Sequence, residues 1–227
     1  MTTSGTSVFN LDLSEIVEEA FERCGSELRS GYDLKTARRS LNLLFNAWAN
    51  QGVNMWTIDV GTIPLVAGTA TYDLPAGTVD LLEHVIRTGT GVQQSDLSIT
   101  RISVSTYATL PNKNQQGRPI QLLVNRTVAT PSVTLYPTPD ASGPYTLAFW
   151  RLRRMQDAGN GINTMDVPFR FVPAMVSGLA YYLSMKIPGA LERMQLLKAQ
   201  YDADWDDASS EDRDKAAVRF VPRVAHV

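Results

Sequence analysis

Leu34–Gly52 has the sequence LKTARRSLNLLFNAWANQG, and its apolar residues recur at helical spacing. Residues three and four apart lie on one face of an α-helix, so this spacing predicts an amphipathic helix with one buried side. Asp33 is its predicted N-cap and Gly52 its predicted terminator. The apolar stripe consists of Leu34, Ala37, Leu41, Leu44, Phe45 and Trp48.

A shorter segment before this helix follows the same pattern. Asp12 and Glu15 have the three-residue spacing of a capping box, which predicts a helix start. Gly25 is suited to end the helix in the left-handed conformation. Two amphipathic helices with a short polar link predict an αα-hairpin, so residues 1–54 are expected to form the first half of an α domain. The apolar positions of the first helix are Leu13, Ile16, Val17, Ala20, Phe21 and Cys24.

The hydrophobic period changes from Met55 onward. Alternating apolar and polar residues predict β-strands there, and clusters of Gly, Pro and Asn separate them. Strands interrupted this often are typical of antiparallel sheets rather than of alternating strand–helix units. We expect residues 55–160 to form an inserted antiparallel β-sandwich or barrel-like domain, with a helical turn at Ser105–Leu110. The predicted strands cover residues 56–60, 69–73, 81–88, 98–104, 120–126, 132–136 and 145–153.

Helical spacing returns after the β region. Asp166 is a predicted N-cap, and the run from Phe171 is apolar around most of its circumference, which predicts a central helix. Pro188 is predicted to open a fourth helix, and residues 161–208 complete the α domain. The expected fold class is therefore α+β: a bundle of four main helices, an inserted β domain, and an extended C-terminal docking tail at residues 209–227.

The composition is that of an ordinary globular protein. The chain has 227 residues and a formal net charge of −2, so it is not a basic nucleic-acid binder as a whole. Cys24 is the only cysteine, which excludes an intrachain disulfide and fits folding in a reducing cytoplasm. Met1–Ser7 lacks the pattern of a secretory signal. The apolar run Phe171–Met185 is shorter than the roughly 20 residues of a spanning helix and contains Pro173, so a buried helix and no membrane partner are expected.

The sequence contains no catalytic or cofactor motif that we can identify. It has no Gly-x-Ser-x-Gly, no phosphate-binding loop and no Gly-x-Gly-x-x-Gly. Its two histidines, His84 and His226, and its single cysteine cannot form a zinc site. We expect no enzyme activity, no cofactor and no metal. A virion-associated cell-wall hydrolase is an alternative, because such chemistry needs only two carboxylates and the chain has 23 acidic residues.

Two groups of like-charged residues are candidate contact sites. The basic group, Arg151, Arg153 and Arg154, ends the last predicted strand and is a candidate contact for an acidic partner; a solvated strand end is the alternative. Carboxylates near a helix C-terminus oppose the helix dipole at a cost of about a few tenths of a kcal/mol each. Either the fourth helix continues beyond its carboxylates or another role selects them. These carboxylates are Asp202, Asp204, Asp206 and Asp207.

The C-terminal residues alternate between basic and apolar side chains. Such a segment has too little apolar surface to fold alone, but it can become ordered on a partner by strand addition. A frayed terminus is the alternative. The candidate binding residues of the tail are Arg213, Lys215, Arg219, Phe220, Val221, Pro222 and Arg223.

Taken in order, these segments resemble a known family. The chain is similar to the head-to-tail adaptors of short-tailed bacteriophages, the family of tail tubular protein A and of the tail accessory factor called a packaged-DNA stabilisation protein. The similarity lies in packing and turn patterns that cover most of the chain, and none of them is a catalytic motif. The stretches that carry it are Ile16–Gly25, Leu34–Gly52, Trp56–Pro75, Tyr145–Met155, the helix with Tyr201 and Trp205, Glu211–Asp214 and Arg219–Pro222.

The resemblance implies a structural virion protein at the head–tail interface, made in the host cytoplasm. The expected assembly is a homo-oligomeric ring, a dodecamer, between the portal protein and the tail nozzle (tail tubular) protein, with a tail fibre or tailspike as a further contact. Double-stranded DNA would pass through its channel without sequence-specific binding. The tail would then hold the portal, and the aspartates Asp202–Asp207 would be candidates for facing the channel. A DNA-binding stabiliser of the packaged genome is a further alternative, which requires a basic stripe.

Overall fold

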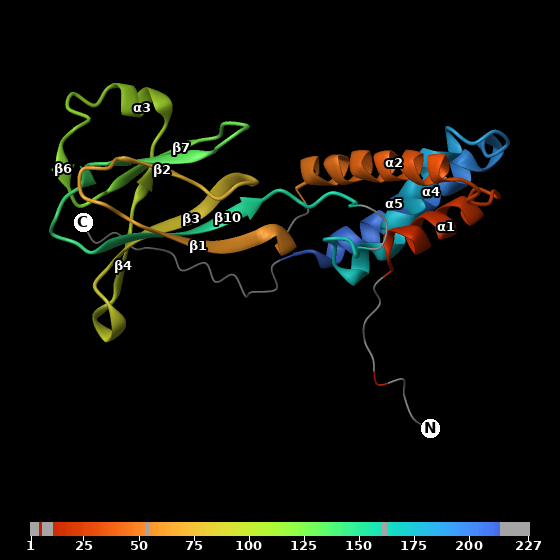
Figure 1. Ribbon diagram of the computed structural model, residues 1–227, viewed down its shortest axis with the longest axis horizontal. Helices are drawn as coiled ribbons and strands as arrows, with labels where there is room; N and C mark the ends of the chain where they lie inside the picture. The colour runs from red at the N-terminus through yellow and green to blue at the C-terminus, as the bar shows by residue number, and fades with distance from the viewer. Residues whose placement is uncertain (1–4, 6–10, 53–54, 160–162, 214–227) are drawn as a thin grey trace, which may run out of the picture. The chain divides into compact units, whose positions relative to one another are not determined.

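The computed structural model describes residue 5 and residues 11–52, 55–159 and 163–213. The chain divides into two compact units (Figure 1). Met1–Trp56 and Met155–Val227 together form one unit, here called the helical unit, and Thr57–Arg154 forms the other, here called the β unit. The segment expected as the inserted domain, residues 55–160, is slightly wider than the β unit at both ends.

The helical unit is a bundle around one central helix. Helix α4 packs against α1, α2 and α5, and residues on most of its circumference are buried, as its all-round apolar sequence predicts. The four main helices expected from the sequence are therefore present among the described residues. The elements of the unit are α1 (Leu13–Arg23), α2 (Gly31–Asn50), η1 (Met55–Thr57, which ends at the boundary), η3 (Phe169–Phe171), α4 (Val172–Ser184), η4 (Leu191–Arg193) and α5 (Met194–Glu211).

The predicted ends of α1 are confirmed. The backbone N–H of Glu15 donates to Asp12 Oδ1 at 2.9 Å, and the backbone N–H of Asp12 donates to Glu15 Oε2 at 2.9 Å. This reciprocal pair satisfies two N–H groups that a helix start leaves without a partner. Gly25 follows the helix with φ +74°, the left-handed conformation that favours glycine.

Three predicted helix starts are wrong. The N-cap of α2 is Ser30, and Asp33 is its capping-box partner three residues later, because the hydroxyl accepts from the Asp33 N–H at 3.3 Å. Asp166 does not cap the next helical segment, because the N-cap of η3 is Pro168; the Asp166 carboxylate accepts from the backbone N–H of Gln156 at 3.1 Å. Pro188 does not open α5, because Gly189 follows with φ +87° and turns the chain before η4.

An aromatic cluster joins the segment before the β unit to the segment after it. Trp48 of α2 is fully buried, and its ring centroid lies 5.7 Å from that of Phe171 and 5.1 Å from that of Trp205 on α5. The Trp48 indole N–H donates to the Tyr201 hydroxyl at 3.0 Å. Because buried polar groups need a partner, this bond fixes α2 and α5 in one arrangement. Segments from both sides of the β unit therefore share one core.

The β unit consists of three small sheets. Two have four strands, in the orders β1-β10-β3-β4 and β2-β8-β7-β5, and the third pairs β6 with β9. Buried residues from β3 and β10 and from β7 and β8 belong to one hydrophobic cluster, so the two larger sheets share a core. The strands are β1 (Ile58–Pro64), β2 (Thr71–Asp73), β3 (Thr78–Thr88), β4 (Ser95–Ser98), β5 (Thr100–Arg101), β6 (Gln116–Gly117), β7 (Gln121–Asn125), β8 (Ser132–Tyr136), β9 (Thr138–Pro139) and β10 (Tyr145–Arg153); η2 (Gly91–Gln93) and α3 (Val104–Ala108) lie between strands.

The sheets differ from the prediction in two respects. Within residues 57–154 they are open, with β1 and β4 as the edges of one sheet and β2 and β5 as the edges of the other, so the barrel-like closure is wrong. They are also not wholly antiparallel, because β5 pairs with β7, and β6 with β9, in parallel. The expected helical turn near Ser105–Leu110 is confirmed by α3. Gly61 of β1 lies opposite Phe149 of β10, where an added Cβ would come within 2.6 Å of the aromatic ring.

His84 of β3 is half-buried. It is the register partner of Phe149, and neither of its ring nitrogens has a hydrogen-bond partner in the described part of the chain. Burial lowers the pKa of His84 below its ordinary value, Glu83 opposes this shift, and Arg101 adds to it. The imidazole ring is therefore neutral at neutral pH, and it packs in the sheet as an uncharged side chain.

Acid is expected to destabilise the β unit through His84. Because the folded-state pKa lies below the ordinary 6.5, the stability that the neutral ring contributes is complete above pH 6.5 and is lost as the pH falls below it. We expect the urea midpoint of the β unit to drop between about pH 7.5 and pH 5, and His84→Leu to reduce that drop. An equally steep pH dependence in the variant would contradict this assignment.

Candidate interaction surfaces

The C-terminal tail starts from an anchored residue at the end of α5. The Asp212 side chain is fully buried and forms an ion pair with Arg170, while its Oδ2 accepts from the backbone N–H of Met55 at 3.2 Å. Three segments that are distant in sequence meet at this carboxylate, here called the tail anchor. Because α5 extends to Glu211, the tail begins later than the predicted Ser209.

Only the first of the predicted portal-binding residues is described by the structure. Arg213 is exposed and directly follows the tail anchor. The other predicted contacts lie outside the described residues, so their role stays a prediction. They are Lys215, Arg219, Phe220, Val221, Pro222 and Arg223.

The four aspartates of α5 lie within the helix rather than at its end. Asp202 and Asp206 are one turn apart on the same exposed side, and Asp202 forms an ion pair with Lys198. Asp204 projects from a different side and accepts from the Gln200 side chain at 2.7 Å. Since α5 continues to Glu211, the unfavourable dipole interaction expected for a terminal position is weakened. The four carboxylates do not form a single patch, and Asp207 is exposed between the two sides.

Two of the three arginines in the predicted basic group are held within the β unit. The Asp59 carboxylate forms ion pairs with Arg151 at 3.3 Å and with Arg153 at 3.4 Å. Arg151 also donates to the carbonyl of Pro75 at 3.3 Å and to the Thr78 hydroxyl at 3.0 Å. Arg151 and Arg153 therefore stabilise the end of β10 against the turn before β3. Arg154 is exposed, and it is the member of the group whose side chain is best placed for a partner.

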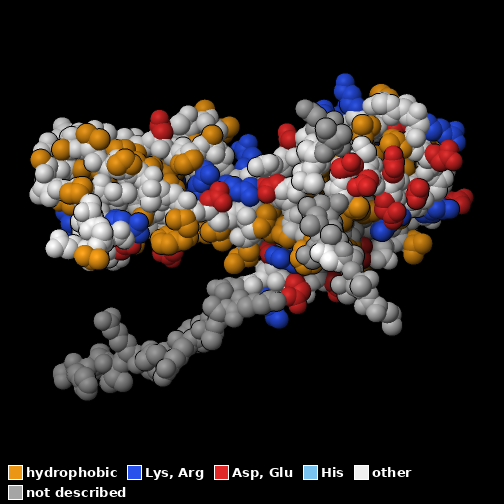
Figure 2. Space-filling model, turned by 60° about the horizontal axis from the view of Figure 1, so that its bottom comes forward, with side chains coloured by type: hydrophobic (Ala, Val, Ile, Leu, Met, Phe, Trp, Pro, Cys, Tyr) orange, Lys and Arg blue, Asp and Glu red, His pale blue; other side chains and the backbone are white. Residues whose placement is uncertain are grey.

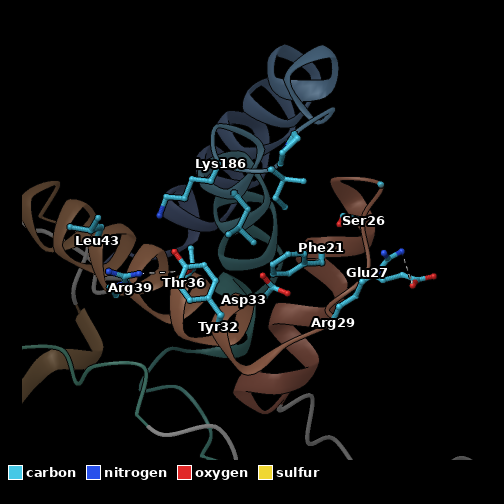
Figure 3. A pocket seen from close by; sticks show the side chains of 14 residues that line it. Phe21, Ser26, Glu27, Arg29, Tyr32, Asp33, Thr36, Arg39, Leu43 and Lys186 are labelled. Carbon is cyan, nitrogen blue, oxygen red and sulfur yellow. Dashed lines mark hydrogen bonds and ion pairs between the residues drawn. The ribbon is translucent and has the colours of Figure 1, made fainter.

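A groove of about 900 Å³ lies between α1 and α2, over the end of α4; it is here called the α1–α2 groove (Figure 3). Its carboxylates are used internally, since Glu27 pairs with Arg29 at 3.5 Å and Asp33 belongs to the α2 capping box. Its other cations are Arg39 and Lys186. Among the described residues they bond to hydroxyl groups and not to carboxylates: Arg39 donates to Thr36 at 3.5 Å and Lys186 to Ser40 at 2.6 Å.

Burial and the neighbouring Arg39 lower the pKa of Lys186. Figure 3 shows Lys186 extending toward the helix that carries Arg39. Two cations are thus close enough to repel one another, and the residues described in the helical unit supply no carboxylate to either. The α1–α2 groove therefore has an excess of positive charge.

A second groove, of about 480 Å³, lies on the other side of α1 and is here called the α1–α4 groove. Glu15, Glu18, Glu19 and Glu22 line it from α1, and Val172 and Pro173 from α4. Glu19 pairs with Arg23 at 2.9 Å, and Glu15 is used in the α1 capping box. Glu18 and Glu22 are exposed and have no ion pair among the described residues. Acidic side chains gather on one face of the helical unit in Figure 2.

Cys24 is a core residue, as its place on the apolar stripe of α1 predicts. Its Sγ donates to the Ala180 carbonyl at 3.2 Å, and burial raises the pKa of the thiol to about 11, with Arg193 opposing the shift. A thiol with this pKa stays protonated and is a poor nucleophile. Within residues 11–52, 55–159 and 163–213, no group of His, Cys, Asp and Glu is arranged to hold a metal ion. No described helix has the length and apolar character needed to cross a membrane.

Sequence reasoning did not find the tail anchor or the two grooves. The spacing of Glu15, Glu18, Glu19 and Glu22 was visible as the polar face of α1, but helical spacing alone does not show that a neighbouring helix forms a groove beside it. No local sequence pattern marks Asp212 as a buried ion-pair residue, because both of its partners are distant in sequence.

One comparison with known proteins gives a match that spans both units. A protein-family model described as SU10 adaptor protein matches residues 11–223. The matched range begins just before α1 and continues beyond the tail anchor at Asp212. No curated protein matches the chain.

Proposed function

The chain belongs to the SU10 adaptor protein family, a family of phage head–tail adaptors with a structural role, and we propose that it forms a ring, a dodecamer, between the portal protein and the tail nozzle protein. In this proposal the ring surrounds part of the DNA ejection channel, and a tail fibre or tailspike is a further contact. The protein would be made in the host cytoplasm and act in the virion.

The observation that carries this proposal is the continuation of the family match beyond the residues that the structure describes. The match reaches residue 223, whereas α5 ends at Glu211. The matched family sequence thus includes the segment after Arg213, and binding to a partner is the function that the alternating basic and apolar residues of this segment support. The tail anchor at Asp212 would fix the point from which the segment reaches the portal.

The α5 aspartates are proposed to face the channel through their exposed side. A negatively charged wall repels DNA phosphates, so the genome can slide without binding, whereas a basic wall would bind phosphates strongly. Asp206 is exposed, and Asp202 on the same side is partly neutralised by Lys198. The internal pairing of Arg151 and Arg153 with Asp59 gives little support to the alternative of a DNA-binding stabiliser.

Deletion of the tail after Arg213 is expected to weaken binding to the portal strongly. The deletion starts beyond the tail anchor and α5, so the helical unit should keep its fold. We expect co-sedimentation with the portal of the same phage to fall at least about tenfold, since interface energy is concentrated in a few residues. A matched control, Val128→Ala in an exposed loop of the β unit, should bind as the full chain does. Full affinity of the truncated protein would refute the portal-binding role of the tail.

A further inference from the structure

Helix α1 separates two grooves of opposite charge. After ion pairs are taken into account, the α1–α4 groove keeps the carboxylates of Glu15, Glu18 and Glu22, and the α1–α2 groove keeps the cations Arg39 and Lys186 beside the single carboxylate of Asp33. Glu18 and Glu22 are one turn apart on α1, so they present two carboxylates on one ridge. The surface on one side of α1 is therefore acidic, and the surface on the other side has an excess of positive charge.

Apolar side chains accompany the charges on both sides. Tyr32 and Leu43 line the α1–α2 groove with exposed fractions of 71% and 58%. On the other side of α1, Leu196 is 71% exposed in a small hollow that it shares with Arg23. Exposed apolar groups beside a charged rim are the composition of a protein–protein interface.

We propose that these two surfaces bind one another in neighbouring copies of this chain, with Glu18 and Glu22 of one copy beside Arg39 and Lys186 of the next. This inference rests on the proposed ring. A contact between two different patches of the same chain is heterologous, and repeated contacts of this kind generate a ring when the rotation closes. The proposal thereby assigns the subunit–subunit contact to the helical unit.

A second copy fits these surfaces better than a nucleic acid does. DNA would supply phosphates for Arg39 and Lys186, but it would leave the glutamate ridge without a partner. Another copy of the chain supplies both the acidic and the basic surface at once, at equal stoichiometry. Such a contact would stabilise the charged form of Lys186, because a neighbouring carboxylate would offset the repulsion from Arg39.

Charge reversal tests the proposal when adaptor copies are counted on the portal. One variant carries Arg39→Glu and Lys186→Glu, and the other carries Glu18→Arg and Glu22→Arg. Mass photometry of portal rings gives the number of adaptor copies bound at each adaptor concentration. Lys35→Glu is the control, because Lys35 is an exposed cation of α2 that does not line the groove. Circular dichroism of each variant checks that the helical unit is folded.

We expect each reversed variant to bind the portal in isolated copies and to lose cooperative filling. The adaptor concentration at which half of the portal sites are occupied should rise about tenfold or more. An equimolar mixture of the two variants should restore filling, because each then meets a complementary neighbour. If either variant alone filled the portal cooperatively at the concentration that the wild-type protein needs, the proposed contact would be wrong. That result would not contradict the ring. Failure of the wild-type chain to bind the portal would instead contradict the proposed function.

Salt dependence of the wild-type protein provides a test that needs no variant. Interface charges are screened at high ionic strength, so cooperative filling should weaken as the salt rises from about 0.05 M to about 0.5 M. Filling that is unchanged over this range would overturn the charge pairing even if the variants do not fold.

Discussion

Trp48→Ala is expected to lower the free energy of unfolding of the helical unit by about 3–5 kcal/mol. The indole is fully buried between Phe171 and Trp205, so its removal leaves a large cavity that the neighbouring rings cannot fill without moving. The change also leaves the Tyr201 hydroxyl without the indole N–H that it accepts. This variant therefore tests whether the segments before and after the β unit share one core.

Urea unfolding followed by helical circular dichroism measures the effect. Tyr201→Phe is the matched control, because it removes the hydrogen bond and keeps the ring; we expect a loss of about 1 kcal/mol. If Trp48→Ala cost no more than Tyr201→Phe, the Trp48 ring would contribute no packing energy beyond the hydrogen bond, and the shared core of the two segments would be contradicted.

Asp212→Ala is expected to release the end of α5 and destabilise the helical unit by about 2 kcal/mol. The buried carboxylate is shared by Arg170 and by the backbone N–H of Met55, so its removal leaves two donors without their partner. The loss stays below that of a fully buried ion pair, because Arg170 is about one-third exposed and water solvates it in part.

Hydrogen exchange of the last turn of α5 measures this release. Exchange of the backbone amides near Ala208–Asp212 should become faster in Asp212→Ala, whereas Asp206→Ala on the exposed side of the same helix should leave it unchanged. Equal exchange in both variants would show that Asp212 does not hold the root of the tail.

The helices were largely predictable because helical spacing is a local property. The stripe from Leu34 to Trp48 and the all-round apolar run of α4 are confirmed by burial. Helix starts were less predictable, because several polar residues near each start can accept the same backbone N–H groups. Ser30 and Asp33 both accept in the capping box of α2, and the sequence does not say which one is the N-cap.

Most of the longer strands were also predictable, but the strand expected at residues 98–104 was wrong, because β4 ends at Ser98, β5 covers only Thr100–Arg101 and α3 begins at Val104. The pairing of the strands was not predictable. Alternation locates β7, β8 and β10 to within a residue or two at either end. It does not determine which strands become neighbours, and β5, with only Thr100 and Arg101, is too short to carry a pattern. The parallel pairing of β5 with β7 depends on long-range contacts that local spacing cannot reveal.

The candidate contact residues were also visible in the sequence, whereas their partners were not. A run of arginines is visible in the sequence, but the partner of Arg151 and Arg153 is Asp59, which lies about 90 residues earlier and comes close only through the pairing of β1 with β10. The α1–α2 groove likewise requires α1, α2 and the end of α4 to be packed together before Arg39 and Lys186 meet.

Electron microscopy of the full-length protein mixed with the portal of the same phage tests the central claim most directly. The account predicts a closed ring of this chain on one face of the portal, with density for the tail on the portal surface and the exposed side of α5, which carries Asp206, toward the channel. Portal rings without added density, at protein concentrations that saturate the sites in co-sedimentation, would contradict the assignment of this chain as the ring that joins the portal to the tail.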